Sequence, residues 1–560
     1  MTKEVLLFLP APLFAYAEAY DPPANTMLIL GTYMSDKGIN VALRSQSVPS
    51  NRSGDRCQHY PGTTDLKEYL QLTEKVLNEH PEATHLAISC WQSFLYVSTL
   101  LTALVARQIR PDLPIIVGGY HPTAVPWEFQ LTLGQMENLS RRIWFYNVEA
   151  PTAEFEELEK LALFNPDQPV FDYIIRGPGE SALNNIIVQN NGLRKTSNTM
   201  WGEIPSHGPR YNWDLLEGSE FTSLYPFVMH NNGEPTGQSR VRTLLSRGCA
   251  YHCRFCLDRG ARAYKWRAMS PKEAVEHIQD IENRFNPTTI AFSDPSFGML
   301  RSWRRLFLQE LNNTPTSSRL WTDPRIDLTS REDYASYAKK FFALSFAVES
   351  GSPQQLLIIN KTRNPNRFLE HFLDIVKWNN EFQLKLQITL IFAFPGETFQ
   401  TAIENVEYWK KILKIDAEND VTSTMGYFGT YYHWPGSWIW NNESFFTENL
   451  GTGFLDPVWW NILFTADTIV PWWLEAINPT PKFTWLHGQM ARAKMNGGIN
   501  NYVGLNIDAE TRLQMAEDFI RTWKDGQVEL REDWLTEFNE LWRERQNWLA
   551  SSVVAQRVIC

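Results

Sequence analysis

Short apolar runs separated by helical patterns recur along most of this 560-residue chain, and their order limits what it can fold into. In the first 185 residues the apolar runs that read as strands lie at 5–9, 40–43, 84–89, 114–117 and 173–175. Helical patterns separate them at 25–37, 65–78 and 98–109. Short buried strands that alternate with helices form a parallel, doubly wound sheet. We therefore predict an α/β, Rossmann-like domain over residues 1–185, with ligands bound beyond the C-terminal ends of its strands.

A second series of the same kind begins near residue 241. Its strands are expected at 241–245, 288–292, 319–322, 344–348, 385–391 and 421–427. Helical patterns occur between them at 271–284, 302–312, 331–339 and 401–412. Six β/α repeats predict a full or partial barrel of the TIM type, with its chemistry at the C-terminal mouths of the strands. We place this partial barrel at residues 241–435.

The rest of the chain has a different character. Residues 186–240 are expected to be a linker, and the stretch from 190, rich in Gly, Pro, Asn and Ser, is expected to have little regular structure. After about residue 440 the pattern is mostly helical and rich in aromatic residues, and Trp534, Phe538 and Trp542 nearly fit a helical stripe. We therefore expect residues 436–560 to form a helical C-terminal cap over the barrel.

Composition narrows the class of protein. The net charge is −11, from 52 basic and 63 acidic residues, which argues against a general nucleic-acid binder because such proteins present a basic surface. The apolar run at 5–9 is too short for a signal peptide, and no stretch reaches the roughly 18 apolar residues of a membrane helix. We expect a cytoplasmic protein without nucleic-acid or membrane partners. Six cysteines in 560 residues are not a disulfide scaffold.

Three of these cysteines are clustered directly after the first barrel strand. Cys249, Cys253 and Cys256 have the spacing C-x3-C-x2-C. Iron–sulfur clusters are usually held by four cysteines, so three thiolates on one face of a cubane leave one iron open. An open iron can bind a small molecule through an amine and a carboxylate, as S-adenosylmethionine (SAM) does. Phe255, inside the motif, would shield the cluster from water. We predict a [4Fe–4S] cluster on these three thiolates.

The alternative is a zinc ion held by the three thiolates and His252. Zinc sites favour two well-separated Cys or His pairs, and the sequence has no second pair. This makes zinc the less favoured metal for the motif.

The cysteine motif is similar to the signature of the radical SAM superfamily, whose fold is a β/α barrel. Further segments resemble its cobalamin-dependent (class B) branch. Residues 346–351, Phe-Ala-Val-Glu-Ser-Gly, resemble a Gly-x-Glu-Ser-Gly segment, with Ala347 where Gly is common, and 394–398 resemble a Pro-Gly-Glu-Thr turn. The resemblance implies that three residues at strand ends contact SAM: Asp294, Glu349 and Ser350. Two simpler roles stay open, a salt bridge for Glu349 and a helix N-cap for Thr398.

Two motifs in the first domain also follow predicted strands. Gly118 and Gly119 open the segment Gly-Gly-Tyr-His-Pro-Thr and would let backbone approach a large flat ligand closely. Residues 177–180 read Gly-Pro-Gly-Glu. Together these motifs resemble the cobalamin-binding domain of class B enzymes. The resemblance implies that cobalamin is bound by the motif residues and by side chains after the third strand: Gly118, Gly119, His121, Gly177, Glu180, Ser89 and Trp91.

One motif of other cobalamin proteins is missing. The Asp-x-His-x-x-Gly motif, whose histidine binds cobalt, is absent, and the comparable residues 35–38 read Ser-Asp-Lys-Gly. We therefore expect base-off cobalamin without a histidine ligand, with His121 more suited to orienting its loop than to binding cobalt. A nicotinamide-binding domain would need Gly-x-Gly-x-x-Gly after the first strand, and Pro10 and Pro12 stand there instead.

The resemblance implies an enzyme, a cobalamin-dependent radical SAM C-methyltransferase of natural-product biosynthesis. In that family a methyl group passes from SAM through methylcobalamin to an unactivated carbon, after a 5′-deoxyadenosyl radical from a second SAM has removed its hydrogen. The implied substrate is a small-molecule or peptide precursor. The implied partner is an external electron donor such as flavodoxin or ferredoxin.

Other functions stay open. One is a class B enzyme that forms or rearranges rings without methylation. Another is a tryptophan-type methyltransferase that modifies an sp2 carbon without making the radical. A sensor without turnover is disfavoured by the intact cysteine triad and Glu349.

Catalytic side chains are sought after the barrel strands. We take Tyr427 and Tyr431, near the end of the sixth strand, as candidate catalytic residues. Further candidates to face the substrate are Tyr432 and His433 after the same strand, and Asp323 and Arg325 after the third strand. A role in packing or capping stays open for all of them.

Overall fold

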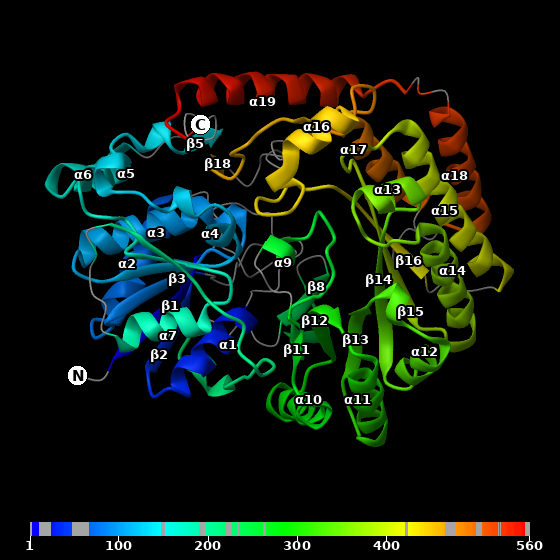
Figure 1. The fold of residues 1–560 in the computed structure, drawn as a ribbon, viewed down its shortest axis with the longest axis horizontal. Helices are drawn as coiled ribbons and strands as arrows, with labels where there is room; N and C mark the ends of the chain where they lie inside the picture. The colour runs from blue at the N-terminus through cyan, green and yellow to red at the C-terminus, as the bar shows by residue number, and fades with distance from the viewer. Residues whose placement is uncertain are drawn as a thin grey trace.

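A computed structural model gives the fold of the chain (Figure 1). It describes residues 3–10, 24–46, 66–146, 152–189, 194, 196–219, 227–231, 234–260, 265–419, 424–464, 476–499, 507–524, 526 and 528–554. Asp65, at the start of one expected helix, and residues 421–423, at the start of one expected strand, lie outside these ranges. Among the described helices, none has the length and apolar character needed to cross a membrane.

The first domain is built on a six-stranded sheet in which every neighbouring pair is parallel, in the order β2-β1-β3-β4-β6-β7. Its strands are β1 (Glu4–Leu9), β2 (Asn40–Ser45), β3 (His85–Ser89), β4 (Ile115–Gly118), β6 (Tyr173–Arg176) and β7 (Asn198–Trp201). Figure 1 shows helices on both faces of this sheet. These are α2 (Leu66–Glu79) with α3 (Tyr96–Ile109), and α1 (Ala24–Ser35) with α7 (Glu180–Val188). The predicted doubly wound sheet is confirmed.

The segment expected to have little regular structure contributes strands to both sheets, so that expectation was wrong. β7 pairs in parallel with β6 at the edge of the first sheet. β8 (Phe227–Asn231) forms an antiparallel hairpin with β9 (Glu234–Thr243). β7 has four residues, none of them fully buried. A short, half-exposed edge strand lacks the apolar run that marks a central strand, so composition alone could not reveal it.

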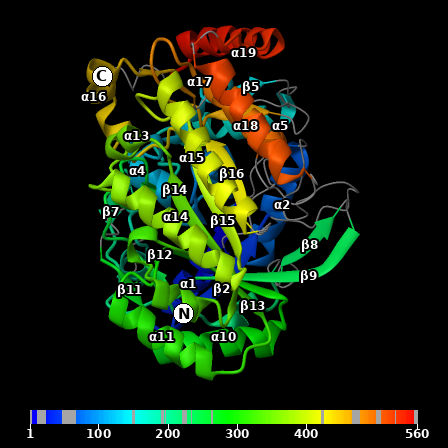
Figure 2. The same ribbon diagram turned by 90° about the vertical axis from the view of Figure 1, so that its right-hand side faces the viewer.

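The second sheet has seven strands in the order β16-β15-β14-β13-β12-β9-β8. Six of these strands run parallel to one another. They are β9, β12 (Thr289–Phe297), β13 (Arg319–Pro324), β14 (Phe341–Glu349), β15 (Lys385–Phe392) and β16 (Thr424–Thr430). The sheet curves without closing, and Figures 1 and 2 show helices along its outer side. They include α10 (Pro271–Phe285), α11 (Arg301–Asn313), α12 (Arg331–Tyr337), α14 (Pro365–Phe382) and α15 (Phe399–Glu418). The predicted partial barrel is confirmed.

Local signals fix where the barrel helices begin. Ser270 accepts a hydrogen bond from the backbone of Glu273 and precedes Pro271, which suits the first position of a helix. Thr398 caps α15 by accepting from the Thr401 backbone. The simpler role considered for Thr398 is therefore real. Both caps follow strands, so each helix leaves from the strand-mouth side of the barrel.

The C-terminal region is mostly helical, as expected. It contains α16 (Glu443–Leu450), α17 (Trp485–Lys494), α18 (Ala509–Trp523) and α19 (Glu532–Ser551), with short strands β17 (Gly453–Phe454), β18 (Ile462–Phe464) and β19 (Ile477–Asn478). β18 pairs with β5 (Trp144–Tyr146) of the first domain, and α18 packs on α15. Figure 1 shows α19 crossing above both halves of the molecule.

Helix α19 is held by a buried ion pair within the C-terminal region and by a hydrogen bond to the first domain. The guanidinium of Arg545 is fully buried, with its Nε 2.7 Å from an Asp456 carboxylate oxygen. The indole N–H of Trp548 donates to the carbonyl of Ser140 at 2.9 Å. An unpaired buried charge is costly, so the Arg545–Asp456 pair fixes α19 in one position. The C-terminal region is thus joined to the first domain through α19, and to the barrel through the packing of α18 on α15.

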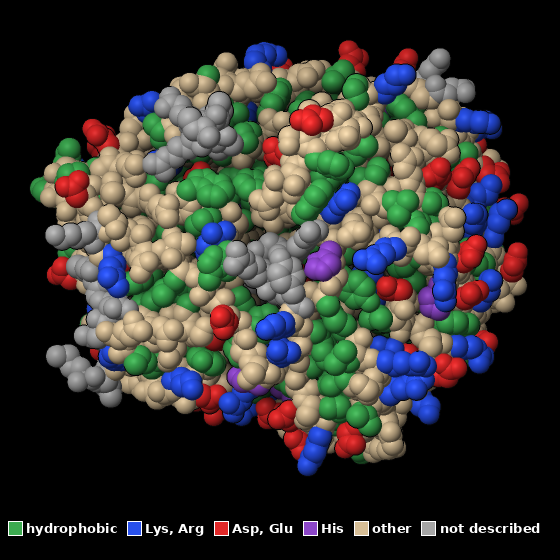
Figure 3. Space-filling view, in the orientation of Figure 1, with side chains coloured by type: hydrophobic (Ala, Val, Ile, Leu, Met, Phe, Trp, Pro, Cys, Tyr) green, Lys and Arg blue, Asp and Glu red, His purple; other side chains and the backbone are tan. Residues whose placement is uncertain are grey.

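Charged side chains of both signs are spread over the surface. On the face in Figure 3, Lys and Arg alternate with Asp and Glu along the barrel helices, without a continuous basic stripe. Hydrophobic side chains gather nearer the middle of this face.

Candidate active site

The cysteine loop leaves the barrel sheet just after β9 and β10 (Ser246–Arg247) and ends in the short helix α9 (Leu257–Gly260). Gly248 has φ +79°, a conformation that favours glycine and turns the chain off the strand. The loop is held from two sides by backbone hydrogen bonds. The N–H of Arg254 donates to Ile359 at 2.8 Å, and its carbonyl accepts from Ile439 at 3.0 Å. These bonds fix the loop before any metal binds.

The three thiols line one cavity of about 250 Å3. Cys253 is 8% exposed, and Cys249 and Cys256 are partly buried. Burial raises the pKa of the Cys249 and Cys256 thiols, because a thiolate without a metal is poorly solvated there. A bound metal reverses this effect by stabilising the thiolate. The site therefore suits thiolates only when a positive centre is present.

The spacing of the sulfur atoms separates a cluster from a single zinc ion. Three thiolates on one zinc, at Zn–S of about 2.3 Å, lie roughly 4 Å apart. Among the described residues, three candidate ligand atoms come within 4.8 Å of one another at Glu4, His80 and Glu82, whereas the three cysteine sulfurs do not all lie within that distance of one another. His252 is exposed and lies outside the lining of the cavity. The arrangement fits the face of a cubane cluster better than the zinc alternative.

The walls of this cluster cavity come from the C-terminal ends of neighbouring barrel strands, where such folds place their chemistry. Predicted residues that line it are Phe255, Asp294, Glu349, Asp323 and Arg325. Phe255 also packs against Phe394, with ring centroids 5.5 Å apart. These ends of β12, β13 and β14 bring charged groups around the thiols.

Asp294 is a buried acid at the end of β12. Its carboxylate accepts from the Leu245 N–H at 3.2 Å and from the Ser246 hydroxyl. Burial raises its pKa to about 7, and these hydrogen bonds partly oppose the rise. Asp294 thus braces the strand end that leads into the cysteine loop and still faces the cavity.

Glu349 and Lys361 form a buried ion pair in the same cavity, 3.1 Å apart. Glu349 has φ +72°, which costs a non-glycine residue roughly 1–3 kcal/mol and is found mainly where surrounding structure imposes it. The salt-bridge role considered for Glu349 is therefore present. The strained backbone also holds the carboxylate at the strand mouth.

Arg325 stands beside the thiols. Its guanidinium lies 3.5 Å from the ring centre of Tyr251 and 4.0 Å from the sulfur of Cys253. It also pairs with Asp327 at 2.8 Å. Asp323 faces the cavity, and this enclosure raises its pKa to about 6. The cavity therefore offers a fixed cation and two acids of raised pKa to a zwitterionic ligand.

A second cavity, of about 280 Å3, lies at the C-terminal edge of the first sheet. Its lining is mostly apolar and includes six residues predicted to bind cobalamin: Ser89, Trp91, Gly118, Gly119, Gly177 and Glu180. These come from the ends of β3, β4 and β6, as expected for an open α/β sheet. The described lining residues include no histidine.

The two neighbouring glycines serve different purposes. A Cβ added at Gly119, whose φ is +123°, would lie 2.3 Å from the carbonyl oxygen of Cys90. A Cβ at Gly118 would make only ordinary contact, with Ile175 at 3.7 Å. Gly119 is thus required for two loops to pack together, and Gly118 leaves space in the cavity.

His121 does not line this cavity. Its side chain is 1% exposed and packs against Tyr96, Phe129 and Trp460. Its Nδ1 lies 2.9 Å from the hydroxyl of Ser93, and burial lowers its pKa to about 3. The expected contact of His121 with a cofactor is therefore replaced by a structural role, because the ring turns into the domain and braces the loop.

Five other predicted residues also lie outside the lining of both cavities: Ser350, Tyr427, Tyr431, Tyr432 and His433. Ser350 is buried, and its hydroxyl donates to Asn405 at 2.9 Å. Tyr427 lies within β16 and is 52% exposed. Tyr431 is buried, with its hydroxyl 3.2 Å from Nδ1 of His433. The positions of these residues therefore do not support catalytic or cofactor-binding roles. Ser350, Tyr431 and His433 are hydrogen-bonded in loops, and Tyr427 is exposed on the outer face of a strand.

The two cavities meet at a common wall. Asp258 and Pro295 line both of them. The hydroxyl of Tyr120, in the second cavity, donates to Asp258 at 2.5 Å. Sequence reasoning missed Tyr120, within the glycine motif, and Asp258, just after the cysteine motif, because nothing in the sequence pairs them.

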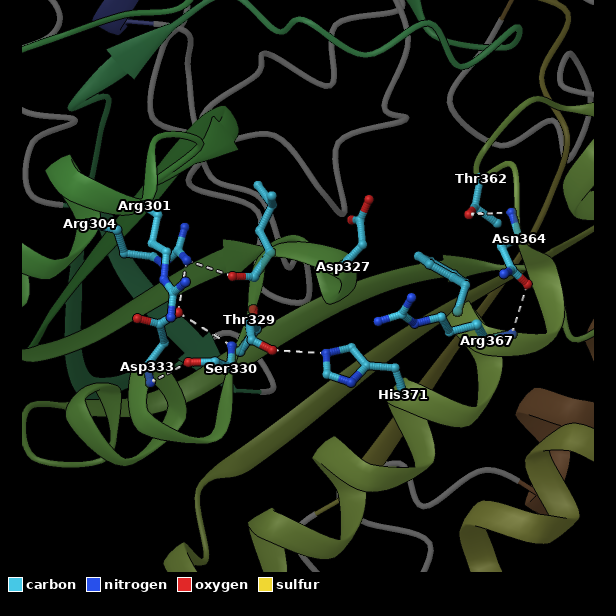
Figure 4. Close-up of a pocket in the computed structure, with 12 residues that line it drawn as sticks. Arg301, Arg304, Asp327, Thr329, Ser330, Asp333, Thr362, Asn364, Arg367 and His371 are labelled. Carbon is cyan, nitrogen blue, oxygen red and sulfur yellow. Dashed lines mark hydrogen bonds and ion pairs between the residues drawn. The ribbon is translucent and has the colours of Figure 1, made fainter.

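A third cavity, of about 530 Å3, lies outside the strand mouths (Figure 4). It shares Phe368 with the cluster cavity, and its Asp327 pairs with Arg325. Figure 4 shows Arg301 on one side and Arg367 on the other, both exposed. Arg325 therefore stands between this outer cavity and the sulfur of Cys253.

Comparisons with known proteins agree with this geometry. An uncharacterized methyltransferase of Pyrococcus horikoshii is 23% identical over 347 residues, covering 60% of this chain and 71% of the relative. An anaerobic magnesium-protoporphyrin IX monomethyl ester cyclase of Synechocystis is 27% identical over 184 residues, covering 30% of this chain and 33% of the relative.

Among solved structures, the radical SAM methyltransferase TsrM from Kitasatospora setae, with cobalamin and a [4Fe–4S] cluster bound, is similar with a TM-score of 0.50. The match covers 78% of this chain and 74% of TsrM at 14% identity, so it shows a shared fold. Residues 243–408, which hold the cysteine loop and most of the barrel, match the Radical SAM superfamily. The barrel of this chain is therefore a radical SAM domain.

Proposed function

We propose that this protein is a cobalamin-dependent radical SAM methyltransferase that moves a methyl group from SAM to an unactivated carbon. The observation that carries the proposal is the meeting of two cavities at one wall, a three-thiol cavity in the barrel and a glycine-lined cavity in the first domain. A methyl group can pass from SAM in the first of these cavities to cobalamin in the second only if the two cavities are adjacent. The printed name of the P. horikoshii relative and the fold shared with TsrM support the same activity.

When bound, the cluster would supply the electron that cleaves SAM, and cobalamin would carry the methyl group. Cys249, Cys253 and Cys256 would hold the cluster, and Phe255 would exclude water from it. Arg325 and Glu349 face the cavity with opposite charges, which suits the carboxylate and amine of SAM.

The first-domain cavity is proposed to take base-off cobalamin without a histidine ligand. Gly118 would face the corrin, and Trp91 would pack against it. His121 would hold the loop in place from behind. The apolar lining would keep water out.

The substrate is proposed to be a small molecule or a peptide precursor of a natural product. Ring formation is the second candidate, because one relative is named as a cyclase. An assay that detects methylated and cyclised products separately distinguishes the two.

An external electron donor such as flavodoxin or ferredoxin is part of the proposal, as is a cytoplasmic location. We place the contact with this electron donor at the outer cavity. Its exposed Arg301 and Arg367 offer positive charge to an acidic donor, and Arg325 leads from it to Cys253.

The test is anaerobic reconstitution of the full chain with iron, sulfide and cobalamin, followed by mass spectrometry of SAM products. The proposal predicts S-adenosylhomocysteine from methyl transfer to cobalamin and, under reducing conditions, 5′-deoxyadenosine. Cobalamin that binds but is never methylated would contradict the methyltransferase and favour the second candidate.

A further inference from the structure

We propose that the hydrogen bond between Tyr120 and Asp258 is a positioning contact that sets the separation and orientation of the two cofactor cavities. This inference rests on the proposed function, since it concerns the transfer of a group between those cavities. It assigns the alignment on which that transfer depends to Tyr120, which stands within the glycine motif, and to Asp258, which follows the cysteine motif.

Tyr120 projects from the glycine loop toward the barrel. It begins α4 (Tyr120–Ala124), directly after Gly119, and lines the first-domain cavity. Its hydroxyl donates to Asp258 at 2.5 Å across 138 positions of sequence. The charge of Asp258 and then burial raise the pKa of Tyr120, so the phenol keeps its proton and remains the donor.

Asp258 belongs to the cysteine loop. It lies two positions after Cys256, and its carboxylate is 3.9 Å from that sulfur. It lines both cavities. A displacement of Asp258 would therefore move the wall between the cavities and the loop that carries the thiols together.

A second contact runs alongside the first. Glu180, at the start of α7, forms an ion pair with Arg247 of β10, two positions before Cys249. Both residues line the first-domain cavity. The two ends of the cysteine loop are thus each linked to a cobalamin-motif loop, which fixes rotation as well as distance.

These contacts are not needed to hold the domains together. The pairing of β5 with β18 and the hydrogen bond from Trp548 of α19 to Ser140 already join the first domain to the C-terminal region. Loss of one hydroxyl would leave those contacts intact. Its effect should therefore fall on alignment rather than on folding.

The test compares Tyr120→Phe with the native chain, both loaded with cluster and cobalamin. The variant removes the hydroxyl and keeps the ring. The matched control is Tyr96→Phe, since the Tyr96 hydroxyl donates to Glu128 at 3.1 Å wholly within the first domain. Pulsed EPR measures the dipolar distance distribution between Co(II) and the reduced cluster, and stopped-flow absorbance measures cobalamin methylation by SAM.

We expect Tyr120→Phe to bind both cofactors normally, to broaden or shift the distance distribution, and to slow methylation about ten- to hundredfold. Asp258→Ala, which removes the acceptor, should shift the distribution in the same direction. Tyr96→Phe should change neither quantity. A native distance distribution and rate in Tyr120→Phe would overturn the inference. Failure of the native chain to bind a cluster or cobalamin would instead overturn the proposed function.

Discussion

Cys253 is the most enclosed of the three cluster thiols, with Arg325 4.0 Å from its sulfur. Cys253→Ala should abolish the visible absorbance of the iron–sulfur cluster, because two thiolates cannot hold the cubane face. Cobalamin binding should persist, since its cavity lies on the other side of Asp258. The control is Cys90→Ala, which removes a buried free cysteine of the first domain. A full cluster in Cys253→Ala, measured by iron content and absorbance, would remove this residue from the ligand set.

Substitutions at Gly118 and Gly119 should have different effects on cobalamin binding and on stability. Gly118→Leu should place a side chain in the cavity and weaken cobalamin binding at least about tenfold, with little change in melting temperature. Gly119→Ala should destabilise the chain by about 1–3 kcal/mol, because of its positive φ and its contact with the Cys90 backbone. Equilibrium dialysis and thermal unfolding separate the two effects. Equal loss of binding with equal loss of stability in both variants would contradict the assignment.

The burial of His121 in its neutral form should make the stability of the protein depend on pH. Its pKa is about 3 in the folded protein and about 6.5 when unfolded. Between these values the unfolded chain binds a proton that the folded chain does not. The free energy of unfolding should therefore fall as pH is lowered below about 6.5, by up to about 1.4 kcal/mol per unit. His121→Gln should flatten the fall in melting temperature between pH 7 and pH 5. An unchanged slope would show that the ring is not buried neutral.

At the scale of single elements, the end of β14 combines the strained backbone of Glu349 with its buried ion pair to Lys361. Lys361→Ala would leave the Glu349 carboxylate buried without its partner, and we expect a loss of about 3–5 kcal/mol in stability. Lys377→Ala is the control, because its pair with Asp374 on α14 is exposed and should contribute less than about 1 kcal/mol. Chemical unfolding measures both. A loss below about 1 kcal/mol in Lys361→Ala would show that the pair is solvated.

Elements with strong local patterns were predictable, and contacts across the fold were not. The apolar runs of β1 and β15 and the helical caps identify the two β/α series, because buried strands need such runs. The thiols and glycine loops follow from local motifs. Lys361 carries no motif, and it reaches Glu349 only because the chain after β14 folds back on the strand end. Tyr120 and Asp258 meet only because the two domains pack together.

At the scale of the whole molecule, two sheets present the C-terminal ends of their strands to each other. The first sheet contributes a glycine-lined cavity and the barrel a thiol-lined one, with Asp258 and Pro295 between them. The C-terminal region, through β18 and α19, holds the two halves in this arrangement. The fold therefore places the two proposed cofactor sites next to each other, which neither domain could do alone.

The most direct test is EPR spectroscopy of the anaerobically reconstituted, reduced chain with and without SAM, together with iron and cobalamin content. An open iron on a three-cysteine cluster predicts about four irons per chain, one cobalamin, and a cluster signal that changes when SAM is added. Zinc or no metal at the cysteines, no bound cobalamin, or a cluster signal that SAM leaves unchanged would contradict it.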